Sequence, residues 1–506
     1  MSSDDSTGDG QAAGDEGSGP DGDDETTAAD VSLGGETAKA TVAKFLMAAA
    51  GFAGSIFFAR YLGPVAFGGF YLLFSVVKLS DRPLAGVSKA GKKRFSEADA
   101  DRSEILGTQL LASLAWALLA SAVAVAAADW LRSYTGLPSA PLLFAVLLIA
   151  VGLFEPLDKL VKARGKVGAA TWADAVRSYL TLPLQVGFVL AGFGAAGMAY
   201  GLSAATLTMV PVMWWLLGTR PTFPDRETVA SVWRFARYSI PQTFLGKAYA
   251  DFDRVILGLL LAPGAVGLYV VAAQLTMPAM FVAAVAAEGL MARVSHSHSR
   301  GEAVAGDVTN TLSFASLLSV PIFFGALAIA RPIVVTVYGG EYAAAATLLI
   351  GLALYQILRT QRAPLSRTLG GLDRPNLNLW IAAVTLAFNV VVGVWLVLRV
   401  GVVGVVVATV LAESLQYLAT AALVKRAVPE VSLLPRALLE QVAAGAVMFV
   451  AVSLVHTVVA VRSWFDLGVL LGVGGVVYFA VLLAASGRFR VTVRSVLEDL
   501  GITLPI

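Results

Sequence analysis

Residues 62–70 read Leu-Gly-Pro-Val-Ala-Phe-Gly-Gly-Phe, and residues 261–269 read Leu-Ala-Pro-Gly-Ala-Val-Gly-Leu-Tyr. The two stretches align without a gap, and each follows a long apolar run. Gly and Pro suit a tight turn between antiparallel helices, because Gly adopts φ values closed to other residues and Pro has a fixed φ. A second pair of stretches, 194–197 and 401–404, has Gly at both ends of each. The sequence therefore indicates an internal repeat.

Apolar runs of about 17 to 25 residues fill most of the chain from residue 42 onward. As helices, such runs span a hydrocarbon core of about 30 Å. Of the 506 residues, 57% are hydrophobic and only 14% are charged, too few charges to cover a soluble domain of this size. We therefore expect an all-α integral membrane protein with about 14 transmembrane helices. They are placed at 42–59, 66–80, 105–128, 138–155, 171–192, 195–217, 239–261, 266–290, 308–330, 343–362, 377–398, 402–424, 437–460 and 466–485.

The repeat predicts how these helices are organised. Its two copies are six predicted helices apart, and because six is an even number, both copies enter the membrane in the same direction. The resulting six-helix bundles, 42–217 and 239–424, are then parallel and related by a pseudo-two-fold axis along the membrane normal. Residues 218–238 form a cytoplasmic linker between the bundles. Two further helices lie within 425–485, and residues 486–506 form a cytoplasmic tail.

The start of the chain has a different composition. Residues 1–37 carry eleven acidic residues and no basic residue, with Gly, Ser, Thr and Ala between them. Such a composition cannot bury enough apolar surface to fold. We expect residues 1–41 to form a disordered acidic tail in the cytoplasm.

The predicted loops differ in charge between the two sides of the membrane. Of the 37 Lys and Arg residues, 26 lie in loops or tails on the side of the N-terminus and five lie in loops on the other side. Cytoplasmic loops carry the excess of Lys and Arg in membrane proteins. We therefore expect a multi-pass protein of the cell membrane with both termini in the cytoplasm.

Several short motifs occur in a fixed order along the chain. They are Arg-Tyr-Leu-Gly-Pro at 60–64, Asp-Arg-Val-Ile-Leu-Gly at 253–258, Tyr-Gly-Gly-Glu-Tyr at 338–342 and Leu-Gly-Gly-Leu-Asp-Arg-Pro at 369–375. With these motifs the chain resembles the polysaccharide-transport branch of the multidrug/oligosaccharidyl-lipid/polysaccharide exporter superfamily, over residues 42–485. The resemblance implies a flippase. Such a protein moves a polyprenyl- or dolichyl-phosphate-linked oligosaccharide to the outer leaflet by alternating access, for cell-surface polysaccharide or glycoprotein biosynthesis.

Charged residues within the predicted helix 239–261 are candidates for substrate binding. Lys247, Asp251 and Arg254 follow the spacing i, i+4, i+7 and so share one face. A charge at membrane depth usually faces a cavity or a partner. A cavity here would accept the phosphate of a lipid-linked glycan, since Arg and Lys both bind phosphate. The alternative is an internal ion pair in which Asp251 neutralises both cations.

A second polar stripe lies on the predicted helix 171–192. Arg177, Thr181 and Gln185 follow Asp174 at helical spacing. This stripe would add groups from the first bundle to the same cavity. The alternatives are that Asp174 pairs with Arg177, or that Arg177 extends to the membrane surface.

Other charged residues have candidate roles in coupling and recruitment. Glu288 and Glu413 lie at or near membrane depth, where either could couple transport to a proton or sodium ion, or hold a contact between helices. Arg359 and Arg362 lie on one face at the cytoplasmic end of the helix 343–362. They could recruit a phosphate head group from the inner leaflet, but charge at this end is also what the topology requires.

The sequence lacks the residues that most catalytic sites need. It has no Cys and three His, and His296 and His298 have no third ligand nearby, so no metal site is expected. No Walker A motif is present. We expect neither cofactor nor nucleic acid. The predicted external loops are too short to hold a catalytic centre, which argues against a membrane glycosyltransferase.

Two further functions stay open as alternatives. A drug/cation antiporter of the same superfamily would fold alike, but a basic cavity favours an anionic substrate. A non-transporting scaffold of a glycan-assembly complex is the other alternative. The expected partners are the phosphate of a lipid-linked glycan, membrane lipid and, as further candidates, glycan-assembly enzymes.

Overall fold

The computed structural model describes the backbone of residues 24–499. Residues 1–23 and 500–506, together with the side chains of residues 24–46, 48, 245, 248–250, 288 and 496–499, lie outside the described residues. The chain divides into two compact units, Met1–Ala50 and Gly51–Ile506. Helix α1 (Asp24–Ser80) includes residues 24–41 of the tail that the sequence predicts to be disordered.

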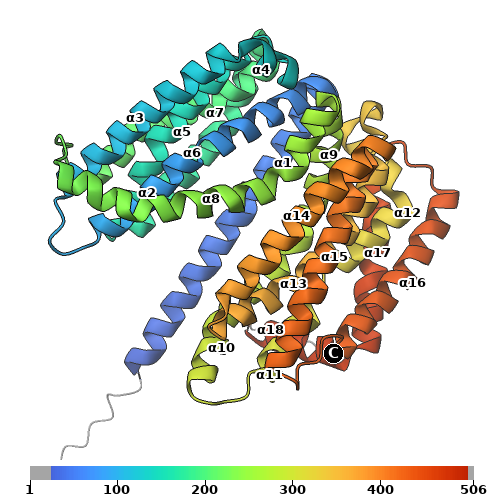
Figure 1. Ribbon diagram of the computed structural model, residues 1–506. Helices are drawn as coiled ribbons and strands as arrows, with labels where there is room; N and C mark the ends of the chain where they lie inside the picture. The colour runs from blue at the N-terminus through green and yellow to red at the C-terminus, as the bar shows by residue number, and fades with distance from the viewer. Residues whose placement is uncertain (1–23, 500–506) are drawn as a thin grey trace, which may run out of the picture. The chain divides into compact units, whose positions relative to one another are not determined.

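The described residues form helices joined by short loops, with no strand among them (Figure 1). The all-α prediction is therefore confirmed. After α1 the helices are α2 (Arg82–Phe95), α3 (Arg102–Ala126), α4 (Ala128–Thr135), α5 (Ala140–Ala163), α6 (Val167–Phe188), η1 (Val189–Phe193), α7 (Gly194–Leu217), α8 (Arg226–Leu260), α9 (Pro263–Thr276), η2 (Met277–Ala279), α10 (Met280–Ser299), α11 (Ala305–Ala315), α12 (Ser319–Tyr338), η3 (Gly340–Tyr342), α13 (Ala345–Gly371), α14 (Pro375–Val400), α15 (Val402–Ala427), α16 (Arg436–Val458), α17 (Trp464–Ala485) and α18 (Gly487–Asp499).

Equivalent glycines of the repeat break the helices in the same way. Gly194 has φ 55° and ψ −138°, and Gly401 has φ 65° and ψ −143°. An L-residue with a side chain rarely adopts such a conformation, so both positions need Gly. Gly63, with φ 73° and ψ 171°, interrupts α1 at the predicted turn. The parts of α1 before and after Gly63 correspond to the predicted helices 42–59 and 66–80.

Several boundaries differ from the sequence-based assignment. Helix α2 lies in the stretch 81–104, which we assigned to a loop, and α8 begins at Arg226, inside the predicted linker. The predicted helix 266–290 is divided by η2 into α9 and α10. Pro278 lies at this break, and Pro cannot donate the backbone hydrogen bond that a continuous helix needs. The predicted helix 308–330 is likewise divided into α11 and α12.

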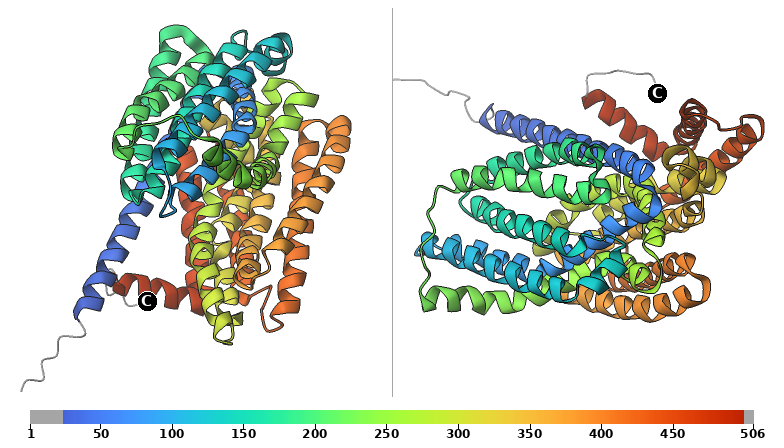
Figure 2. Two further views of the ribbon diagram at one scale, coloured as in Figure 1. Left: turned by 60° about the vertical axis from the view of Figure 1, so that its left-hand side comes forward. Right: turned by 90° about the horizontal axis from the view of Figure 1, so that it is seen from above.

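Helix α8 connects two groups of packed helices. Helices α2, α3, α5, α6 and α7 pack against one another, and α9 to α15 form a second set of contacts. Helix α8 packs against α2 along its first part, and it also contacts α9, α14 and α15. Helices α16 and α17 pack together and against α12, as Figures 1 and 2 show with α16 and α17 in red beside the yellow α12.

Ten helical stretches of the described residues are long and apolar enough to cross a membrane. Two of them span two predicted transmembrane helices each: Ala49–Ser80 covers part of 42–59 and all of 66–80, and Val167–Leu217 covers 171–192 and 195–217. Helices α8 and α13 are not among the ten, and they are the helices with the charged faces noted above. The protein is a multi-pass membrane protein, whereas the number of its crossings stays a prediction.

Candidate functional site

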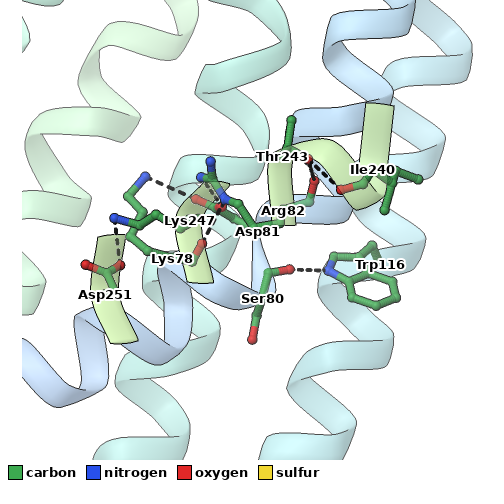
Figure 3. Close-up of polar contacts among 9 residues, drawn as sticks. All are labelled: Lys78, Ser80, Asp81, Arg82, Trp116, Ile240, Thr243, Lys247 and Asp251. Carbon is green, nitrogen blue, oxygen red and sulfur yellow. Dashed lines mark hydrogen bonds and ion pairs between the residues drawn. The ribbon is translucent and has the colours of Figure 1, made fainter. Parts of the chain in front are cut away.

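The candidate site forms where α8 runs alongside α2 and the junction of α1 with α2 (Figure 3). The Thr243 hydroxyl of α8 donates to the backbone oxygen of Arg82 at 3.2 Å. Further along α8, the Arg254 guanidinium lies 6.0 Å from the centre of the Tyr71 ring. These two contacts set an antiparallel alignment. Lys247, one turn after Thr243 on α8, therefore lies level with Lys78, one turn before Arg82 on α1.

Three predicted site residues of α8 come together around one carboxylate. Lys247 Nζ lies 2.7 Å from one oxygen of Asp251, and Arg254 Nη1 lies 3.0 Å from the other. The Asp251 side chain is 3% exposed, whereas the two cations keep 26% and 30% of their surface. The carboxylate is thus buried beneath two cationic groups that still reach open space.

A second carboxylate at the junction of α1 and α2 has the same arrangement. Asp81 pairs with Lys78 at 3.1 Å and with Arg82. The junction itself is held by Trp116 of α3, whose indole N–H donates to the backbone oxygen of Ser80 at 2.7 Å. Sequence reasoning missed these three charged residues, because Lys and Arg at a helix end are usually explained by topology. The available signal was the i, i+4 spacing of Lys78 and Arg82 around an acid.

The two groups form a site with excess positive charge, which we call the basic cluster. Its antiparallel alignment brings Lys247 level with Lys78. Four cations share two carboxylates within the cluster, and Glu155 of α5 lies in the field of Lys78 and Arg82, so the cluster keeps an excess of positive charge. Such charges are costly at membrane depth unless an anion joins them. The cluster can therefore bind a phosphate or diphosphate group. It comprises Lys78, Asp81, Arg82, Lys247, Asp251 and Arg254.

The polar residues predicted to form a stripe on α6 lie in two different environments. Arg177 pairs with Asp174 at 2.8 Å, as the sequence alternative proposed, and lines a cavity of about 260 Å³ that Lys78 and Arg82 also line. The Thr181 hydroxyl donates to the backbone of its own helix, at 2.8 Å from the Arg177 oxygen. Gln185 is buried and donates to the Met198 backbone oxygen at 2.8 Å. The structure therefore places Arg177, but not Thr181 or Gln185, at this cavity.

The structure joins two candidates that the sequence treated separately. The buried carboxylate of Glu413 forms an ion pair with Arg362, and the Glu413 side chain is 1% exposed. Arg359 lies one turn away with its guanidinium 5.7 Å from the centre of the Tyr355 ring. The coupling role of Glu413 and the recruiting role of the two arginines stay predictions. The side chain of Glu288 lies outside the described residues.

Asp253 is the centre of a separate polar cluster. The Tyr269 hydroxyl donates to its carboxylate at 2.6 Å, and the Thr409 hydroxyl lies 3.0 Å from both carboxylate oxygens. The amide oxygen of Asn389 is buried nearby. Oxygen groups of this kind can hold a proton or a small hard cation. The described residues contain no group of three or more His, Cys, Asp or Glu suited to a metal ion.

An apolar cavity of about 340 Å³ lies between α12, α16 and α17. Side chains of α9 and α13 close it, and nearly all of its surface is apolar. Such a cavity suits a hydrocarbon chain and offers almost no hydrogen bonds. The lining includes Leu275, Ile329, Leu349, Met448, Leu470 and Tyr478.

Comparison with known proteins assigns the chain to a family. The profile of the family described as polysaccharide biosynthesis protein matches residues 57–347, more than half of the chain. The chain belongs to this family. The resemblance that the sequence motifs carry, to the polysaccharide branch of the exporter superfamily, is thereby confirmed.

Two curated relatives of this family member come from Haloferax volcanii. The probable low-salt glycan biosynthesis flippase Agl15 is 27% identical over 378 residues, which cover 74% of this chain and 79% of the relative. The probable flippase AglR is 23% identical over 457 residues, which cover 88% and 95% of the two chains.

Solved structures share the fold. The inward closed conformation of the lipid II flippase MurJ matches with a TM-score of 0.74 and 14% identity, over 90% of this chain and 99% of that one. An inward-facing multidrug resistance MATE family transporter of the MOP superfamily matches with a TM-score of 0.57 and 18% identity, over 75% and 95%. These likenesses confirm the fold class.

Proposed function

We propose that the protein is a flippase for a lipid-linked glycan, moving it from the cytoplasmic to the outer leaflet by alternating access. The basic cluster is the observation that carries the proposal. Its excess of positive charge, set among apolar helices, matches the phosphate or diphosphate that joins a glycan to its lipid. The family and the names of the two Haloferax volcanii relatives support the same function.

The apolar cavity between α12, α16 and α17 supports a substrate with a long hydrocarbon chain. A polyprenyl or dolichyl carrier would place its head group at the basic cluster and its chain among apolar side chains. The protein is then a transporter and not an enzyme. Its partners are the lipid-linked glycan and membrane lipid, and glycan-assembly enzymes are candidate partners. The proposed location is the cell membrane, with both termini in the cytoplasm.

The basic cluster argues against the alternative of a drug/cation antiporter. A cationic drug would meet the four cations of the basic cluster, and both carboxylates of the cluster are already paired with them. Repulsion between like charges at low dielectric would oppose its binding. A scaffold without transport would not need unbalanced charge at membrane depth.

The proposal is tested by deleting the gene in its host and quantifying lipid-linked oligosaccharide and surface glycan by mass spectrometry. We expect the lipid-linked precursor to accumulate while the surface glycan falls. The chain with Arg254→Ala or Lys78→Ala should reach the membrane without restoring the surface glycan. Arg132→Ala is the matched control, because Arg132 is 51% exposed, forms an ion pair with the exposed Asp129 and donates to the Pro138 backbone oxygen, away from the basic cluster. Normal glycan levels in the deletion strain and in both variants would contradict the proposal.

A further inference from the structure

The cavity beside the basic cluster contains groups that a phosphate site does not need. It measures about 260 Å³ and lies among α1, α2, α5, α6 and α7. Lys78 and Arg82 line it and also belong to the basic cluster, so the two spaces adjoin. The other charged residues of its lining are Glu155, Asp158 and Arg177, and the rings of Phe74 and Phe154 complete two of its walls.

Glu155 differs from the other carboxylates around this cavity. Asp81 and Asp174 pair with cations at 3.1 Å and 2.8 Å, and Asp158 pairs with Lys162 at 2.7 Å. Within the described part of the chain, no hydrogen bond or ion pair engages the Glu155 carboxylate. Glu155 is partly buried, and a carboxylate withdrawn from water without a hydrogen-bond partner is costly. The cavity is therefore missing a hydrogen-bond donor for Glu155.

The charges around Glu155 restrict what can provide that donor. Asp81, Lys78, Arg82 and Lys159 act on its carboxylate from α1, α2 and α5. A second phosphate would be repelled by Glu155 and Asp158. A simple cation would be repelled by the lysines and arginines that face the same space.

A neutral group with several hydroxyls can bind both the acidic and the basic side chains of this cavity. Each sugar hydroxyl donates to a carboxylate or accepts from Lys and Arg, and hydrogen bonds to ionised groups are the strong ones. The apolar face of a sugar ring can rest on an aromatic ring such as Phe74 or Phe154. The Arg177 guanidinium already lies 5.2 Å from the centre of the Phe154 ring, so a donor and an aromatic face stand side by side.

We propose that the sugar attached directly to the phosphate of the lipid-linked glycan binds in this cavity, with the Glu155 carboxylate accepting hydrogen bonds from its hydroxyls. The phosphate occupies the adjoining basic cluster, and Lys78 and Arg82 lie between the two sites. This inference rests on the proposed function. It adds a sugar subsite in the first group of helices and names Glu155 as its specificity residue.

The test compares two lipids that differ only in the sugar. The full-length purified protein is titrated in detergent with dolichyl phosphate, and then with dolichyl phosphate carrying one glucose or one mannose. We expect at least one glycosylated lipid to bind roughly tenfold tighter than dolichyl phosphate, since a hydrogen bond to a charged group is of that strength. Glu155→Leu should remove this preference, and its affinity for dolichyl phosphate should be at least that of the unchanged protein, because a negative charge beside Lys78 and Arg82 is lost.

Two further variants make the outcome specific. Glu155→Gln keeps the size and an acceptor oxygen, so it should retain part of the preference even if Glu155→Leu fails to fold. Glu97→Leu is the matched control, because Glu97 is 46% exposed, pairs with Arg94 and lies outside the cavity. It should bind both lipids as the unchanged protein does.

The remaining outcomes separate this proposal from the proposed function. Equal affinity of the unchanged protein for all three lipids would overturn the sugar subsite and leave the flippase proposal standing. Binding of none of the lipids would overturn both. A preference that survives in Glu155→Gln and Glu155→Leu, with only the pH dependence of binding lost, would show that Glu155 binds a proton and not a sugar.

Discussion

Gly68 and Gly267 occupy equivalent positions of the internal repeat, and each packs against the proline turn of the other copy. A Cβ atom added to Gly68 would overlap the backbone oxygen of Pro263, and one added to Gly267 would overlap that of Pro64. The contact is therefore reciprocal, as a two-fold relation between the copies requires. Both turns lie at the end of the bundles that is predicted to face outward.

Gly68→Ala and Gly267→Ala should each loosen this contact. Overpacking of a close contact costs about 1–3 kcal/mol. Here it would destabilise the conformation in which the two turns are in contact. A Val266→Cys reporter is buried beside the contact and should react faster with a maleimide in either alanine variant. The natural chain has no Cys, so the reporter is the sole thiol.

Gly168→Ala is the control for that measurement. Gly168 lies in α6 with no atom within 4 Å of an added Cβ, so the change should not alter the reporter. If the reporter reacted equally fast in all the variants, the proline turns would not limit access at this end. The double alanine variant should react little faster than either single one, because both changes act on one contact.

A disulfide across the same contact should stop transport reversibly. Val65 and Gly264 are also equivalent positions of the repeat, and a Cβ on Gly264 would lie 3.5 Å from Cγ2 of Val65. This distance is compatible with a disulfide between Val65→Cys and Gly264→Cys. Because alternating access requires the two turns to separate, the oxidised protein should lose transport and a reducing agent should restore it. Either single variant under oxidation is the control, and full transport by the cross-linked form would contradict the prediction.

Sequence reasoning succeeds here where the deciding information is local. The similar turns at Pro64 and Pro263 reveal the repeat in the sequence, because both prolines follow apolar helices of similar length. Helical spacing likewise predicts that Lys247, Asp251 and Arg254 share a face. Whether these residues bind substrate stays a prediction.

Sequence reasoning fails where two distant helices meet. Glu413 and Arg362 are 51 residues apart, and no periodicity within either helix predicts their ion pair. Lys78 lies level with Lys247 only because α8 packs along the junction of α1 and α2. Thr181 and Gln185 look like a polar stripe, yet their hydrogen bonds serve the backbones of α6 and α7.

Asp251→Asn should destabilise the protein more than it impairs substrate binding. Removal of the carboxylate takes away the counter-charge that Lys247 and Arg254 share, and breaking a buried pair costs about 3–5 kcal/mol. Because both cations keep about a quarter of their surface exposed, we expect a smaller loss of about 1–3 kcal/mol. Thermal unfolding in detergent measures the effect.

The double variant Asp251→Asn with Lys247→Gln is the control for this loss. It has one cation fewer to compensate, so it should regain part of the stability. Stability equal to that of the unchanged protein in Asp251→Asn would show that the pair does not stabilise the fold. Binding of dolichyl phosphate by Asp251→Asn should persist, because the single substitution raises the positive charge of the basic cluster.

Substitutions in the ion pair of Arg362 and Glu413 can distinguish a structural role of Glu413 from a role in coupling transport to an ion. With Glu413 1% exposed, Arg362→Met leaves its charge buried and should cost about 3 kcal/mol or more. Glu413→Gln removes the charge instead, and the double variant Arg362→Met with Glu413→Gln should recover stability relative to Arg362→Met alone. A double-mutant cycle of thermal unfolding measures this coupling energy. If the double variant is stable and still transports, Glu413 holds α13 against α15. If it is stable but no longer responds to a proton or sodium gradient, Glu413 couples transport to that ion.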